Sequence, residues 1–141
     1  MIGLDVGSKR IGVAISDELA VLATPRGAIA RRSYNKDAAA IAEIVEAAAA
    51  ERIIVGLPLG LSGAASKQTE QVQRFAAMLA ERVDVPVELW DERLTTVMAH
   101  SIVPSSRQAR RAGAVDAVAA AFILQGYLDH SSSRAFSPPS S

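Results

Sequence analysis

Cysteine is absent from the 141 residues of this chain, and aromatic residues make up only 4% of it. Without cysteine the chain can form no disulfide, no thiolate nucleophile and no cysteine-ligated zinc site. Because aromatic side chains are scarce, the core has to be built from Ala, Val, Leu and Ile, a composition that suits helices packed on a parallel sheet. Half of the residues are hydrophobic, and the length suits one globular domain with a single core.

Net charge is also lacking, since 15 basic residues balance 15 acidic ones. This balance argues against general binding of polyanions, although it is compatible with a local basic patch. No uncharged apolar run is long enough to cross a bilayer, and a strand expected from Ile2 onward leaves no room for a signal peptide. We therefore expect a cytoplasmic protein with no membrane partner.

The first seventeen residues carry the most distinctive pattern. Two apolar runs, Ile2–Val6 and Ile11–Ser16, flank a glycine-containing turn with Lys9 and Arg10, which predicts a β-hairpin. Asp5 lies inside the first run, where a carboxylate is costly unless a cation or a metal compensates it. Alternatively, Asp5 accepts hydrogen bonds from backbone N–H groups of the turn. The two basic residues beside it suit a phosphate group.

The remaining chain alternates between strand and helix patterns, which predicts an α/β fold in which a five-stranded mixed sheet has helices on both faces. We expect one domain over residues 1–128 and a disordered, Ser- and Pro-rich tail over residues 129–141. The expected elements after the hairpin are a strand from Val21–Ala23 and Gly27–Ala30 interrupted by Pro25, a helix from Asn35 or Lys36 to about Glu51, a strand Arg52–Gly56, a helix Ser66–Val83, a strand Pro86–Trp90, a short helix Thr95–Val103 and a last helix Ala112–Leu128.

Two motifs lie at the expected carboxyl ends of parallel strands, where binding sites form in such sheets. One is Gly56-Leu57-Pro58 and the other is Asp91-Glu92-Arg93. The first opens a loop to Ala65 that contains Gly56, Pro58, Gly60 and Gly63. We expect this loop to be mobile without substrate and able to close over a nucleic-acid backbone.

Two further carboxylates are candidates for chemistry. Asp116 shares a helical face with small and apolar residues such as Ala120 and Ile123, so it should face the sheet, either as a favourable charge near the helix start or as a ligand. In the strand that ends at Asp91, side-chain alternation places Glu92 on the side of Trp90 and Asp91 on the other side. Position alone does not decide which of the two acids is functional.

Three carboxylates form an all-oxygen set that suits Mg²⁺ or Mn²⁺ rather than zinc. Two such ions at close range are the usual device for in-line cleavage of a phosphodiester. A metal-dependent nuclease is therefore the function that these residues favour.

Four motifs together closely resemble the YqgF (RuvX) family of Holliday junction resolvases. They are IGLDVGSKRIGVAISD at residues 2–17, GLP at 56–58, DERLTT at 91–96 and VDAVAA at 115–120. The resemblance covers about residues 1–128 and implies an RNase H-like fold and a nuclease that trims the 5′ end of precursor 16S ribosomal RNA, resolves Holliday junctions, or does both. It also implies that Asp5, Glu92 and Asp116 are the catalytic, metal-binding acids, with Glu92 rather than Asp91 as the acid of the third motif.

Two positions depart from the pattern of that family. The loop after Gly-Leu-Pro usually continues with Asn and an acidic residue, whereas here residues 59–63 read LGLSG. The residue after the last Asp is often Lys, but here it is Ala117. A substrate contact of the loop is therefore lost or moved, while all three acids are retained.

Basic residues near these motifs are expected to hold phosphate groups of nucleic acid. The expected partners are precursor ribosomal RNA or branched DNA, with the ribosome as a further partner, and the protein is expected to be a monomer or a homodimer. The basic residues are Lys9, Arg10, Arg93, Arg107, Arg110 and Arg111.

Two other functions are compatible with parts of the pattern. Sugar kinases and actin-like ATPases open with a similar hairpin, but they bind nucleotide between two such lobes, and 141 residues supply only one. A non-catalytic binding module is the other alternative, yet a protein that only binds phosphates gains nothing from three converging negative charges.

Overall fold

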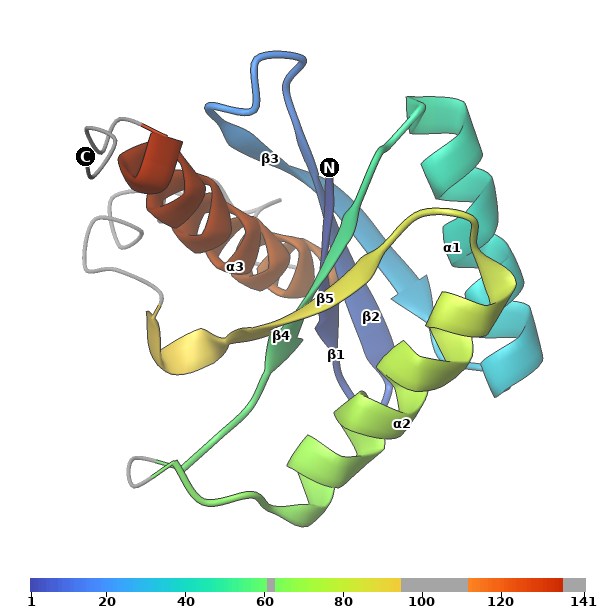
Figure 1. Ribbon diagram of the computed structural model, residues 1–141. Helices are drawn as coiled ribbons and strands as arrows, with labels where there is room; N and C mark the ends of the chain where they lie inside the picture. The colour runs from blue at the N-terminus through green and yellow to red at the C-terminus, as the bar shows by residue number, and fades with distance from the viewer. Residues whose placement is uncertain (61–62, 95–111, 136–141) are drawn as a thin grey trace.

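The computed structural model of the protein describes residues 1–60, 63–94 and 112–135 (Figure 1). Five strands form one mixed sheet in the order β3-β2-β1-β4-β5, with β1 (Ile2–Val6) at its centre. Helices α1 (Tyr34–Ala48) and α2 (Lys67–Arg82) cover one face, and α3 (Ala112–Ala135) covers the other. The predicted fold class, a five-stranded mixed sheet with helices on both faces, is confirmed.

The central strand belongs to the predicted hairpin. β1 pairs in antiparallel fashion with β2 (Arg10–Ser16), and the Gly7 N–H donates to the Arg10 carbonyl at 2.9 Å to close the turn. In this register Asp5 lies opposite Gly12. The second strand of the hairpin begins one residue earlier than predicted.

Parallel pairing brings three strand ends to one edge of the sheet. β1 pairs in parallel with β4 (Ile53–Leu57), which pairs in parallel with β5 (Val87–Asp91). The carboxyl ends of all three strands therefore point the same way, and the segments that follow them meet at that edge.

Pro25 lies inside β3 (Ala23–Ala30) and does not interrupt it, contrary to our expectation. β3 is an edge strand, where a residue without an N–H group is tolerated. Gly12 pairs with Ala28 while Ala14 pairs with Pro25, so β3 carries one extra residue between these pairs. This bulge lets the strand continue past the proline.

The core on the α1 and α2 face follows from the apolar stripes of both helices. Ile41 of α1 and Phe75 and Leu79 of α2 are fully buried against the sheet. Ser33 caps α1 by accepting from the Lys36 N–H at 3.2 Å, and Ser66 caps α2 in a capping box with Thr69.

Helix α3 lies unusually close to the hairpin because glycines face it. A Cβ atom on Gly12 would lie 1.9 Å from the carbonyl oxygen of Asp116, and one on Gly3 would lie 2.7 Å from Cβ of Leu124. Both distances are shorter than any that a Cβ atom can adopt, so neither position can carry a side chain unless the helix moves. The helix backbone therefore rests directly on β1 and β2, and its register on them is fixed.

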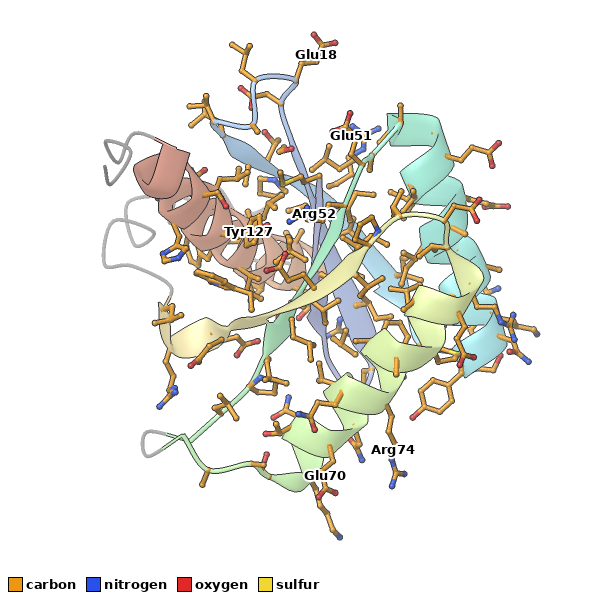
Figure 2. The ribbon with its side chains drawn as sticks, viewed as in Figure 1. Glu18, Glu51, Arg52, Glu70, Arg74 and Tyr127 are labelled. Atoms are coloured by element: carbon orange, nitrogen blue, oxygen red, sulfur yellow. The ribbon has the colours of Figure 1, made fainter. Side chains whose placement is uncertain are left out.

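A polar network holds the far half of α3 on the sheet. The Arg52 guanidinium donates to the Tyr127 hydroxyl at 2.6 Å, and this hydroxyl donates to Glu88 at 3.0 Å. Figure 2 shows Tyr127 of α3 beside Arg52, which directly precedes β4. The position of α3 is thus defined by close packing at one end and by hydrogen bonds at the other.

Helix α3 continues to Ala135, beyond the predicted end at Leu128. Residues 129–135, which we expected to be disordered, are helical, and His130 packs on the Trp90 ring with 5.3 Å between ring centroids. The rest of the expected tail and the short helix expected from Thr95 lie outside the described residues. Within residues 1–60, 63–94 and 112–135, no helix is long and apolar enough to cross a membrane.

Replacing Gly12 by Ala should push α3 away from the hairpin and destabilise the fold by about 1–3 kcal/mol, the usual cost of overpacking. Urea denaturation measures this loss. Gly60→Ala is the matched control, since its Cβ would meet nothing closer than 3.6 Å. Equal stability of the two variants would contradict the close approach of α3.

Candidate active site

The three acids that we expected to meet lie at the edge where the parallel strands end. Asp5 lies in β1, Glu92 directly follows β5 in a 3₁₀ turn (Glu92–Leu94), and Asp116 lies near the start of α3. Burial, and then the charge of Asp116, raises the pKa of Asp5 to about 6. Burial, and then the charges of Asp5 and Asp91, raises the pKa of Glu92. Asp5 is therefore close enough to both Asp116 and Glu92 for its carboxylate to repel theirs.

Glycines make room for two of these carboxylates. The close contact at Gly12, which pairs with Asp5, brings the start of α3 over the hairpin and so brings Asp116 toward Asp5. A Cβ atom on Gly56 would lie 2.9 Å from Oε1 of Glu92, so this carboxylate lies against the bare backbone at the end of β4.

Asp116 has a basic partner within the protein. Nε of Arg10 donates to Oδ2 of Asp116 at 2.7 Å, and both side chains are partly exposed. The carboxylates of Asp5 and Glu92 have no hydrogen bond or ion pair within the described ranges. The alternative in which Asp5 caps the hairpin turn is therefore wrong, and the charge of Asp5 is left uncompensated beside that of Asp116.

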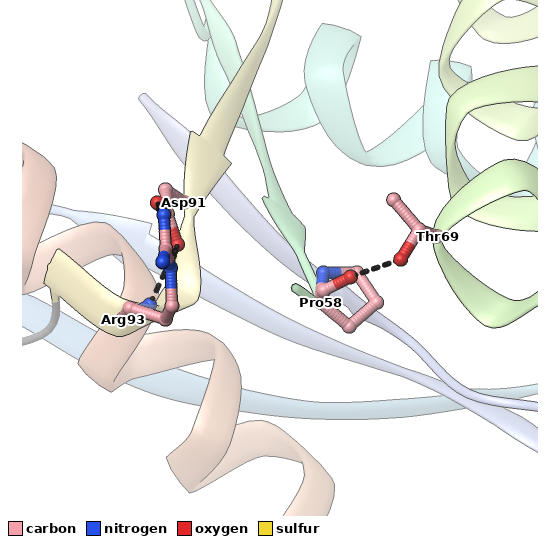
Figure 3. A network of polar contacts seen from close by, with 4 residues as sticks. All are labelled: Pro58, Thr69, Asp91 and Arg93. Atoms are coloured by element: carbon pink, nitrogen blue, oxygen red, sulfur yellow. Dashed lines mark hydrogen bonds and ion pairs between the residues drawn. The ribbon is translucent and has the colours of Figure 1, made fainter. Parts of the chain in front are cut away.

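The structure separates the roles of Asp91 and Glu92. Asp91 accepts from the backbone N–H of Arg93 at 2.9 Å and from its guanidinium at 2.7–3.1 Å (Figure 3). These bonds lower the pKa of Asp91. Asp91 therefore stabilises the turn after β5, while Glu92 faces Gly56 and the charge of Asp5.

The three acids are not arranged as the ligands of a bound metal ion. No group of three acidic or histidine side chains in residues 1–60, 63–94 and 112–135 is gathered as tightly as a bound metal requires. The donor set is nevertheless all oxygen, and its mutual repulsion is the kind that a divalent cation relieves.

The predicted basic residues are distributed over several places. Lys9 is exposed in the hairpin turn, Arg10 contacts Asp116, and Arg93 contacts Asp91. Arg107, Arg110 and Arg111 lie outside the described residues.

The glycine- and proline-containing loop after β4 is held at its ends. The Thr69 hydroxyl donates to the Pro58 carbonyl (Figure 3), and the Gly63 N–H donates to the Gly60 carbonyl at 2.8 Å. A Cβ atom on Gly63 (φ 81°) would lie 3.4 Å from Nη1 of Arg93, so Gly63 lies beside the Arg93 guanidinium. The loop thus borders the Asp91-Glu92-Arg93 turn, although residues 61–62 lie outside the description.

Two structural features could have been predicted from the sequence but were not. The role of Gly12 could have been found from its place opposite Asp5 in the hairpin, because only a missing side chain admits a helix there. The other feature is the pair Arg31 and Asp37, whose side chains form a largely buried ion pair at 3.0 Å. Two consecutive arginines before a serine cap were the available signal.

Comparison with known proteins gives consistent matches along almost the whole chain. The family model described as "RuvX: Holliday junction resolvase" matches residues 1–130. A protein of Desulforamulus reducens named "Putative pre-16S rRNA nuclease" is 42% identical over 131 residues, covering 92% of this chain and 96% of the relative. A protein of Symbiobacterium thermophilum with the same name is 43% identical over 141 residues, covering 99% and 96%.

The fold has a counterpart among solved structures. RuvC of Thermus thermophilus superposes with a TM-score of 0.59 over 92% of this chain and 95% of that one, at 14% sequence identity. A likeness at this identity shows the RNase H-like fold alone, which the sequence predicted. The match over residues 1–130 and the relatives above 40% identity show more: the chain belongs to the RuvX family of nucleases, which are hydrolases that act on phosphodiester bonds.

Proposed function

We propose that this protein is a divalent-metal-dependent endonuclease of the cytoplasm that processes the 5′ end of precursor 16S ribosomal RNA. The observation that carries this proposal is the position of Asp5, Glu92 and Asp116 where the parallel strands end, with Asp5 close enough to feel the charge of Asp116 and to act on Glu92. The names of the relatives support the RNA substrate. The neutral net charge favours recognition of a shaped substrate, alone or on the ribosome, over general binding of nucleic acid.

The donor set fits Mg²⁺ or Mn²⁺, and we propose that Asp5, Glu92 and Asp116 hold two such ions. When bound, these ions would supply a water nucleophile at neutral pH and stabilise the leaving oxygen of the phosphodiester. The close packing of α3 on Gly12 and of Glu92 on Gly56 holds two of the carboxylates on rigid backbone.

Arg10 is the basic residue best placed to orient the reacting phosphate. Its Nε atom is bound to Asp116, so its guanidinium lies at the acidic cluster itself. A guanidinium there can form paired hydrogen bonds to phosphate oxygens as the substrate enters. Lys9, one residue earlier in the turn and exposed, can contact the strand beside the cleavage point.

Replacing Asp5 by Asn should stabilise the metal-free protein by about 1–3 kcal/mol, because it removes a half-buried charge that Asp116 repels. The same change should reduce the rise in melting temperature caused by Mn²⁺ and lower cleavage about a hundredfold or more. Thermal melts with and without Mn²⁺, together with a cleavage assay, measure these effects. Asp116→Asn should change metal-free stability by less than about 1 kcal/mol, since it also loses a partly exposed ion pair with Arg10.

Glu18→Gln is the control for Asp5→Asn, because Glu18 is exposed in the loop after β2 (Figure 2). It should leave the Mn²⁺ response and cleavage unchanged. An Asp5→Asn protein with the normal Mn²⁺ response and full activity would overturn the three-acid site.

Glu92→Gln and Asp91→Asn form a matched pair of adjacent substitutions. We expect Glu92→Gln to lower cleavage about a hundredfold or more, because it removes a ligand of the ions. Asp91→Asn should loosen the Arg93 turn and reduce stability by about 1 kcal/mol while cleavage persists. Cleavage rates and urea midpoints of both variants test which residue binds the ions. If Asp91→Asn lost cleavage and Glu92→Gln kept it, Asp91 would be the metal ligand.

Cleavage of two substrates in Mn²⁺ tests the choice of substrate. The protein should cut a precursor 16S transcript near its mature 5′ end, alone or within small-subunit particles, and should cut a four-way DNA junction more slowly. Asp5→Asn is the control for contaminating nucleases. Preferential cutting of the junction would replace the RNA proposal with junction resolution, the activity in the family's description.

A further inference from the structure

A polar concavity lies at the same edge of the sheet as Asp5, Glu92 and Asp116 but on the other face of the sheet. It has a volume of about 850 Å³ and lies between the β1–β2 turn and the first turns of α1 and α2. Val6 lines it, whereas the preceding residue, Asp5, is one of the three acids of the candidate active site. Because alternate side chains of a strand point to opposite faces, this pocket and the acids flank the same strand end.

The charge of the pocket is positive in a chain with no net charge. Arg31, Arg32 and Lys67 line it, and Asp37 is the one acid among its lining residues. In the described part of the chain, the side chains of Arg32 and Lys67 have neither a hydrogen bond nor an ion pair. Two cationic groups are therefore available to a ligand.

Arg31 is fixed in place before any ligand arrives. Its Nη1 donates to the Gly7 carbonyl at 2.8 Å, and its Nε donates to the buried Asp37 at 3.0 Å. Its guanidinium also lies over the rings of Tyr34 and Phe75, with 5.9 and 5.3 Å to the ring centroids. The Nη2 group keeps its donors unpaired within the described residues.

Backbone N–H groups provide further hydrogen-bond donors at the pocket. Lys67 and Gln68 line the pocket as the first two residues of α2, and their N–H groups make no hydrogen bond within the described ranges. The starts of α1 and α2 both face the pocket, and the partial positive charge of a helix start favours an anion.

The pocket is also lined by one aromatic side chain. Tyr34 lines the pocket with 47% of its surface exposed. Basic groups that hold a backbone phosphate, together with an aromatic ring on which a base stacks, are the means by which proteins bind unpaired nucleotides.

We propose that this pocket binds an unpaired nucleotide of the substrate strand, with its phosphate on Arg31, Arg32 and Lys67 and its base on Tyr34. The proposal rests on the proposed nuclease function, because the occupant is a single-stranded segment that flanks the cleavage point. It would hold the substrate on both sides of β1 and favour RNA with a single-stranded end next to a structured region.

Binding of a short fluorescent single-stranded RNA without divalent metal tests the pocket separately from cleavage. The double variant Arg32→Ala/Lys67→Ala should lower affinity about tenfold or more and reduce the salt dependence by about two phosphate contacts. Tyr34→Ala should lower affinity about fivefold or more. Arg31 is left intact because it neutralises the buried Asp37.

Arg26→Ala is the matched control, because it removes an exposed positive charge of β3 outside the pocket. Its affinity should stay within about twofold of the original protein. If the double variant and Tyr34→Ala bind RNA as tightly as this control, the nucleotide pocket is refuted, whatever the cleavage assay gives. Absence of cleavage by the unaltered protein would instead refute the nuclease proposal and leave these binding results standing.

Inorganic phosphate distinguishes a backbone phosphate from a small free ligand. If phosphate raises the melting temperature of the unaltered protein and not of the double variant, and the double variant also loses RNA affinity, the nucleotide proposal is supported. A phosphate effect with unchanged RNA affinity would overturn it in favour of a small anion.

Discussion

The contact between the start of α3 and Gly12 is the constraint on which the rest of the structure depends. With no side chain at Gly12, the carbonyl of Asp116 sits on the hairpin itself. This single approach sets the height of α3 above β1 and β2, and Gly3 extends it along the helix. It also decides where the carboxylate of Asp116 lies relative to Asp5, so packing and chemistry share one cause.

The acidic edge carries a cost that the packing elsewhere must offset. Asp5 and Glu92 are partly withdrawn from water, and their charges raise each other's free energy. Two uninterrupted apolar clusters, one on each face of the sheet, provide the stabilisation that tolerates this repulsion. The site is thus a destabilised region held by a rigid framework, as is common where proteins bind cations.

Much of this arrangement could be predicted from the sequence because it depends on local patterns. The hairpin and the alternation of strands and helices follow from residue spacing, and the RNase H-like class follows from the four motifs. Pro25 and the length of α3 could not be predicted in this way. Tolerance of Pro25 depends on its edge position, and beyond Leu128 the helix contacts the sheet through His130, which packs on Trp90 from far away in the sequence.

The candidate site could be predicted as a set of residues but not as a set of contacts. Side-chain alternation placed Glu92 on the side of Trp90 without excluding Asp91. The family resemblance chose Glu92, and the bonds between Asp91 and Arg93 give the physical reason why the two acids differ. The pairing of Arg10 with Asp116 joins residues 106 positions apart, so no local pattern could indicate it. Arg31 and Asp37 escaped notice for a related reason, since their importance comes from burial rather than from a motif.

Trp90 gives this molecule a built-in optical reporter. It is the only tryptophan of the chain, it lies two residues before Glu92, and its ring is set edge-on to Tyr127 at 5.5 Å between centroids. Its indole is buried between β5 and α3, and its Nε1 has no hydrogen-bond partner in the described residues. The intrinsic emission of the protein therefore comes from one point, and its wavelength and intensity report whether the helix that carries Asp116 is seated on the sheet.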